Sequence, residues 1–173
     1  METPGETYEI RQAEITIDNR DAFLCTIQEI ARSNSTHIVC FDADKLTGRE
    51  HAKIALHHAL RSFFSGKPIS NSFEMEALLF AAGSRQCLVA ALFGINEGVN
   101  RIFVCIHPSN EDVWKDLSNH MHFVSETWDE MTPEKESRLM VLFGITQEEL
   151  DAVGRDRMKD LLYERIALLH VNR

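Results

Sequence analysis

SFEMEALLFAAGSRQCLVAALFGI, residues 72–95, consists of two apolar segments separated by Gly83-Ser84-Arg85-Gln86. The first segment carries apolar side chains at every helical angle, and a helix that is apolar all round is buried. The second runs from Cys87 to Phe93 without a charge, and Gly94 follows as a helix-ending residue. We therefore predict a buried helical hairpin, around which the rest of the chain is organised.

Two charged residues interrupt this hairpin. Glu76 has Phe73, Leu79 and Phe80 three or four residues away, so its carboxylate needs a partner if it is ionised. Arg85 begins the second segment, where the helix dipole disfavours a cation unless a carboxylate or a bound anion lies nearby. Two compatible hypotheses follow. In the first, Glu76 and Arg85 form a structural pair. In the second, Arg85 and free helix N–H groups bind a phosphate, and both can hold at once.

The remaining patterns predict one domain of the α/β (α+β) class. Strands are expected near residues 8–17, 37–41 and 101–107, with a short one near 120–122. We expect a small mixed or antiparallel sheet of about three to four strands, surrounded by about seven or eight helices. Residues 8–173 form this domain, and residues 1–7 are a loose N-terminus.

Composition narrows the function classes. The chain has 173 residues, of which 44% are hydrophobic and 26% charged, as in soluble globular domains. It has no apolar run of membrane-spanning length and no leader pattern, so we expect a cytoplasmic protein. Its cysteines lie in apolar segments without CxxC spacing, which predicts core thiols in a reducing compartment. These cysteines are Cys25, Cys40, Cys87 and Cys105.

Charge is distributed unevenly along the chain. The net charge of -9 argues against a broad nucleic-acid-binding surface, because phosphate contacts need local positive charge. Residues 45–67, however, carry five basic residues and one acidic residue, Glu50. Cations recur every four residues in the helix expected here, with few acidic neighbours to neutralise them. The row is either a solvated helix face or a functional basic ridge. It contains Lys45, Arg49, Lys53, His57 and Arg61.

An enzymatic alternative comes from Asp42-Ala43-Asp44, which follows an apolar strand. Phosphatases of the haloacid-dehalogenase type place a nucleophilic aspartate and Mg²⁺ at such a strand end. The turn that normally follows that motif is missing here, and the later strand ends in His107-Pro108 without an acidic pair. The pattern favours a polar turn capped by Asp44 or Thr47. We predict no catalytic residue, no metal site and no cofactor.

The order of the motifs carries a family resemblance. HIVCFDADKLTGREHAKIALHHALRSFFSGKPISNSFEMEALLFAAGSRQCLVAALFGI, residues 37–95, resembles the signature half of the PRPK-binding protein family, the small kinase-binding subunit of the KEOPS complex. FGITQEELDAVGRDRMKDLLYERIALL, residues 143–169, is similar to that family's ending. One departure is Phe80, where the family pattern leads us to expect Tyr.

The resemblance implies a non-catalytic protein that binds the small atypical kinase of the complex and supports threonylcarbamoyladenosine modification of tRNA. The resemblance to archaeal-type members also implies a contact with the single-stranded 3′ end of tRNA. The candidates for that contact are Lys45, Arg49, Lys53, Arg61, Lys67 and Arg85. An exposed apolar patch on the C-terminal helix is the candidate kinase contact, formed by Met158, Leu162 and Ile166. The alternative is a kinase-binding module without a tRNA role, which the net charge favours.

Overall fold

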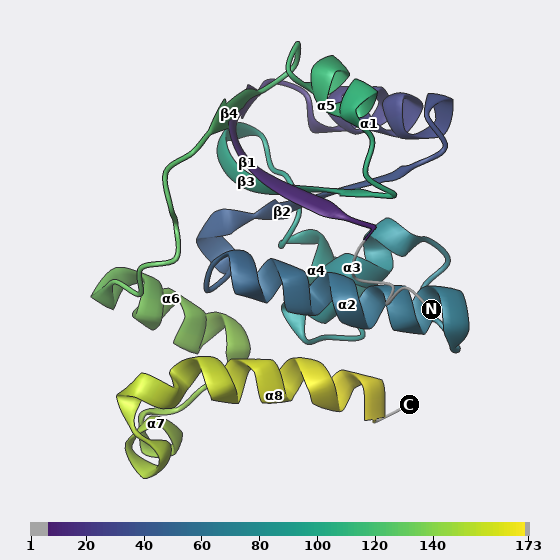
Figure 1. Ribbon diagram of the computed structural model, residues 1–173. Helices are drawn as coiled ribbons and strands as arrows, with labels where there is room; N and C mark the ends of the chain where they lie inside the picture. The colour runs from purple at the N-terminus through teal and green to yellow at the C-terminus, as the bar shows by residue number, and fades with distance from the viewer. Residues whose placement is uncertain (1–6, 172–173) are drawn as a thin grey trace.

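The structure is a computed structural model that describes residues 7–171. The expected loose segment of residues 1–7 lies outside this range except for Thr7. The described residues form a single mixed α/β domain around an open four-stranded sheet (Figure 1). No helix in the described range is long and apolar enough to cross a membrane.

The sheet is antiparallel throughout and has the order β2-β3-β1-β4. Its strands are β1 (Glu9–Ile17), β2 (His37–Asp42), β3 (Gly98–His107) and β4 (His122–Val124). The predictions of a small sheet and of these strands are confirmed. The central strand β3 is apolar on both faces because both faces of the sheet are covered by helices.

The helices lie in layers above and below the sheet (Figure 1). α1 (Arg20–Ser33) and α5 (Glu111–Leu117) cover one face, where Ile102, Val104 and Ile106 of β3 point. α2 (Arg49–Ser65) and α3 (Phe73–Ala82) cover the other face, where Phe103 and Cys105 point. Alternate residues of one strand thus enter two separate cores.

A further layer packs beneath α2 and α3. It contains α6 (Pro133–Phe143), α7 (Gln147–Val153) and α8 (Met158–Val171), and α8 contacts both α2 and α3. Residues 166–171 continue α8 as a helix. Local signals set several boundaries: Asn19 caps α1, Thr132 caps α6, and Thr146 with Glu149 forms a capping box at the start of α7. Short 3₁₀ turns span Ala43–Lys45 and Arg155–Arg157.

Only the first half of the predicted hairpin is buried as expected. In α3, Phe73, Leu79 and Phe80 are at most 1% exposed, and Gly83 ends the helix in the left-handed conformation at φ 60°. The second helix, α4, spans only Cys87–Ala91, and Leu88 is 88% exposed. The expectation of a fully buried hairpin was wrong because five residues make little more than one helical turn, which cannot be enclosed on all sides.

The cysteine prediction is also corrected in part. Cys105 is buried in the core beneath α2, and Cys40 is half-buried on the edge strand. Cys25 and Cys87 are exposed on α1 and α4. An apolar sequence neighbourhood did not decide burial, since each exposed thiol lies on the solvent side of its helix.

Candidate functional site

Glu76 anchors the loop that connects α2 to α3. Its carboxylate is fully buried and accepts hydrogen bonds from Ser62 Oγ at 2.7 Å, from the Ile69 N–H at 2.9 Å, and from the Ser70 N–H and Oγ, both at 2.8 Å. Burial by itself raises the pKa of Glu76, but the hydrogen bonds from Ile69, Ser62 and Ser70 outweigh it and leave the pKa below its usual value. The residue is an ionised structural anchor.

Arg85 follows the C-terminal end of α3, and its hydrogen-bond partner is not Glu76. Its Nη2 donates to the carbonyl oxygen of Leu169 in α8 at 3.3 Å. Among the ion pairs of residues 7–171, none joins Glu76 to Arg85, so the pair expected from the sequence does not form. About 9 Å of helix rise separates Glu76 from the end of α3 at Ala82, and the left-handed Gly83 then turns the chain away.

Arg85 also precedes α4, whose N-cap is Gln86, so it does not occupy the first turn of a helix. It is exposed and lines a shallow hollow of about 490 Å³ between the end of α3 and α8. Arg165 shares this hollow, with Phe143, Leu168 and Leu169. Two guanidinium groups therefore lie beside apolar side chains on one open surface.

Arg165 is held in place by the C-cap of α6 and by α7. Its Nη2 donates to Glu149 Oε2 at 3.1 Å and to the Gly144 carbonyl at 3.3 Å. Within residues 7–171, the hydrogen bond of Arg85 is the one from its Nη2 to the Leu169 carbonyl, and the residue is exposed. Of the two cations, Arg85 has the greater capacity to take up an anion.

The basic row of α2 does not lead into this hollow. Lys53, Arg61 and Lys67 are exposed, whereas Lys45 and Arg49 are half-buried. Lys53 lines a separate hollow together with Tyr8, Glu50, His57 and His58. Lys53 and Arg85 therefore line different hollows of the described residues.

Lys45 has a structural role. Its ammonium lies 3.5 Å from Asp42 Oδ2 and also donates to the carbonyl of Leu92, just beyond the end of α4. The Asp42 carboxylate in turn accepts from the Asp44 N–H at 3.0 Å and caps the 3₁₀ turn Ala43–Lys45. Burial raises the pKa of Asp42, although the Asp44 N–H and Lys45 oppose this. The contacts of Asp42 are those of a turn cap.

The kinase-contact candidates lie inside the protein. Met158 is 2% exposed, and Leu162 and Ile166 are 0% exposed. Their four-residue spacing places them on the face of α8 that packs against α2 and α3. The prediction that they form an exposed patch was wrong, because a regular apolar stripe is the face that a helix buries.

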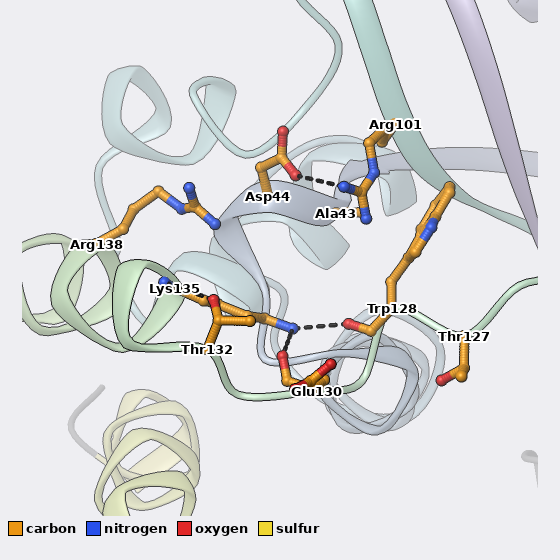
Figure 2. Close-up of a pocket in the computed structure, with 9 residues that line it drawn as sticks. All are labelled: Ala43, Asp44, Arg101, Thr127, Trp128, Glu130, Thr132, Lys135 and Arg138. Carbon is orange, nitrogen blue, oxygen red and sulfur yellow. Dashed lines mark hydrogen bonds and ion pairs between the residues drawn. The ribbon is translucent and has the colours of Figure 1, made fainter.

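Sequence reasoning missed the pocket formed by β3, α6 and the segment before α6 (Figure 2). It encloses about 200 Å³, and the Arg101 guanidinium lies over the Trp128 ring at 4.5 Å. Lys135 is 7% exposed, and its ammonium donates to the carbonyls of Thr47, Trp128 and Glu130. Burial lowers the pKa of Lys135 to about 8. By donating to these three carbonyls, the Lys135 ammonium holds the 127–132 segment against the start of α2.

No group of three or more His, Cys, Asp or Glu side chains in residues 7–171 is arranged to hold a metal ion. The hollow at Arg85 combines positive charge with apolar side chains on one open surface. A search of curated proteins gives no match. A family model described as kinase binding protein CGI-121 matches residues 17–170, nearly the whole domain. The chain therefore belongs to the family of kinase binding protein CGI-121.

Proposed function

We propose that this protein is a non-catalytic, cytoplasmic subunit of the KEOPS complex that binds the small atypical kinase of that complex and holds the 3′ end of tRNA for threonylcarbamoyladenosine modification. The kinase-binding part follows from family membership. The KEOPS and tRNA parts rest on the resemblance of residues 37–95 and 143–169, and on the surface at Arg85.

The observation that carries the tRNA part is the combination of groups at Arg85. A single-stranded 3′ end presents phosphates together with unstacked bases. Proteins bind such ends with cations that follow the backbone and with apolar or aromatic surfaces against the bases. Arg85 supplies the positive charge, because Arg165 is paired with Glu149, and Leu168, which is 44% exposed, supplies apolar surface beside it.

A kinase-binding module without a tRNA role is the second candidate. The net charge of -9 favours it, because a net negative charge opposes the approach of phosphates. The separation of Lys53 from the hollow at Arg85 favours it as well, since one hollow offers few phosphate contacts.

Binding of intact tRNA and of tRNA lacking its 3′-terminal nucleotides separates the two candidates. The measurement is made at low salt, where electrostatic affinity is greatest. We expect the shortened tRNA to bind at least about tenfold more weakly, because stacking is worth about 1–3 kcal/mol per base. Equal affinity for the two tRNAs refutes the role of the 3′ end, and undetectable binding of both selects the module without a tRNA role.

Arg85→Glu tests the residue itself. We expect a loss of about tenfold or more in tRNA affinity, because a charged hydrogen bond of about 1.5–3 kcal/mol is replaced by repulsion. Arg32→Glu is the matched control, an exposed arginine at the end of α1 on the opposite face of the sheet. A circular dichroism spectrum must show that both variants are folded. Equal losses in the two variants exclude a specific site at Arg85.

A further inference from the structure

The pocket between β3 and α6 collects cations from two elements that are far apart in the sequence (Figure 2). Arg101 comes from β3, whereas Lys135 and Arg138 come from α6. The carboxylates that line the pocket are Asp44 and Glu130, so cations outnumber carboxylates there. The Arg101 and Asp44 side chains are 43% and 51% exposed. A ligand in solution can therefore reach the charged groups of this pocket.

Arg101 is held in one orientation without using its hydrogen-bond donors. Its guanidinium carbon lies 4.5 Å from the centre of the Trp128 ring, and this stacking leaves the N–H groups at the edge of the guanidinium free to donate. Its Nη1 lies 3.9 Å from Asp44 Oδ1, which is an ion-pair distance but too long for a hydrogen bond. The N–H groups of Arg101 are therefore available to an acceptor from outside.

Arg138 approaches the pocket from the opposite side. It is exposed, and within residues 7–171 its side chain forms no hydrogen bond or ion pair. Figure 2 shows its guanidinium directed toward Asp44, which thus stands between two arginines. One carboxylate cannot neutralise two guanidinium groups, so this part of the pocket carries an excess of positive charge.

Lys135 contributes charge to the pocket rather than a free donor. An ammonium has three hydrogens, and Lys135 directs its own to the carbonyls of Thr47, Trp128 and Glu130. Because Lys135 is only 7% exposed, solvent screens its charge less than that of a surface lysine. Beside it, Thr132 Oγ accepts the Lys135 N–H at 3.2 Å, so the Thr132 hydroxyl hydrogen remains available to donate into the pocket.

We propose that this pocket binds a small phosphate ligand, either free phosphate or a phosphate monoester, with the phosphate group between Arg101 and Arg138. An arginine pairs with two oxygens of a phosphate, and a monoester has three free oxygens where a carboxylate has only two. Arginines on opposite sides therefore fit a tetrahedral phosphate better than a carboxylate. The volume of about 200 Å³ lies below the roughly 300–1,000 Å³ of pockets for drug-sized ligands, so the ligand is small.

This inference goes beyond the proposed function and does not rest on it. The pocket and the hollow at Arg85 share no lining residue. Its tests involve neither tRNA nor the kinase, so a failure here leaves the proposed function as it stands.

Titration of the full chain with inorganic phosphate and with glycerol 3-phosphate, at constant ionic strength, tests the site. The readout is the NMR signal of each tryptophan indole N–H. Trp128 lines the pocket, whereas Trp114 donates to Glu9 on the other face of the sheet. We expect a saturable shift of the Trp128 signal and none of the Trp114 signal. An unmoved Trp128 signal, or equal shifts of both signals, overturns the site.

The two phosphate ligands identify the source of the phosphate group. Tighter binding of glycerol 3-phosphate supports a monoester, and tighter binding of inorganic phosphate supports the free ion. Succinate is the carboxylate control, and succinate that binds more tightly than both phosphate ligands overturns the assignment to phosphate.

Arg138→Gln should weaken binding of the preferred phosphate ligand by roughly tenfold or more, because the phosphate loses one of its two charged partners. Arg32→Gln is the matched control: Arg32 is an exposed arginine in the last turn of α1, and its replacement removes the same charge. Because Arg138 is exposed, the variant should fold. Equal affinities in the two variants exclude Arg138 as a phosphate contact and overturn the proposal.

Asp44→Asn should have the opposite effect. It removes the carboxylate that competes with phosphate for Arg101, so we expect binding to tighten by roughly threefold or more. Asp21→Asn, an exposed position in the first turn of α1, makes the same change in net charge away from the pocket. A gain in affinity cannot come from unfolding. Equal affinities of the two variants, or weaker binding by Asp44→Asn, contradict the arrangement of charges proposed for this pocket.

Discussion

Replacing Glu76 by Gln should destabilise the fold severely without removing a single heavy atom. Both carboxylate oxygens of Glu76 accept hydrogen bonds, and every partner atom is a nitrogen or hydroxyl that donates. An amide keeps one acceptor oxygen and places an NH₂ group where the other oxygen was. The hydroxyl of Ser62 can rotate to accept from it, but the N–H groups of Ile69 and Ser70 cannot reverse.

The cost follows from these contacts. Hydrogen bonds to a charged group are worth about 1.5–3 kcal/mol each and neutral ones about 1 kcal/mol. Glu76→Gln weakens the charged hydrogen bonds from Ser62, Ile69 and Ser70 to neutral ones. With the new NH₂ group turned toward the partner that tolerates it best, the free energy of unfolding should fall by about 3 kcal/mol. For a chain of this length, that corresponds to a decrease in Tm of about 10 °C. Because Glu76 is fully buried, solvent screens little of this loss.

The assay is the free energy of unfolding from urea titration, followed by circular dichroism. Glu74→Gln is the control on the same helix: its side chain is 39% exposed and pairs with His37, so its loss should cost less than about 1 kcal/mol. Arg85→Gln should also leave stability within about 1 kcal/mol, because Arg85 is not the partner of Glu76. The reasoning is refuted if Glu76→Gln costs no more than Glu74→Gln.

Three further predictions concern buried groups. Burial lowers the pKa of His51 from 6.5 to about 4, so between these pH values the unfolded chain binds a proton that the folded chain does not. The free energy of unfolding should therefore fall by about 3 kcal/mol as pH decreases from 6.5 to 4. His51→Gln should flatten this pH dependence, measured by urea unfolding. Leu162→Ala should lower the free energy of unfolding by about 2–5 kcal/mol. Val141→Ala is the control: Val141 is 83% exposed, so its replacement should cost less than about 0.5 kcal/mol. Lys135→Met leaves three carbonyls without their donor, costs about 2–3 kcal/mol, and should speed proteolysis within residues 127–132.

The window for His51 is set by its contacts. Its Nδ1 accepts from the Thr47 N–H at 3.1 Å, so its Nε2 carries the proton that is donated to the Ala81 carbonyl at 2.9 Å. A second proton on Nδ1 would face the Thr47 N–H, and burial opposes the charge. Glu76 does not contribute to the pH dependence above about pH 4.5. A carboxyl group with a lowered pKa stabilises the fold fully above its usual pKa of 4.5 and loses that effect only at lower pH.

Local signals predicted most of the elements, because a cap or an alternating strand depends on residues close in sequence. Asn19, Thr132 and Thr146 with Glu149 cap α1, α6 and α7 through hydrogen bonds to residues three positions away. The two-sided apolar pattern of β3 likewise predicted an interior strand. The membership of this chain in a kinase-binding family agrees with the resemblance carried by its motifs.

The partners of charged residues were not predictable, because they come from distant segments. Glu76 is satisfied by a loop from residue 69 and by Ser62 one helix away, so a search for an opposite charge nearby suggested the wrong partner. Lys135 meets the Thr47 carbonyl, 88 positions away. The apolar stripe of α8 was predicted as an exposed patch, because the sequence does not show that other helices cover it.

The two outer strands of the sheet are unequal, and this limits what strand addition can build. β2 has six residues, whereas β4 has three, paired only with Gln12, Ala13 and Glu14 of β1. A chain that gains a strand on β2 gives no matching long edge on its far side for the next molecule. Two copies paired along β2 would expose only the three-residue β4 edges, so edge-to-edge pairing would not continue into a filament.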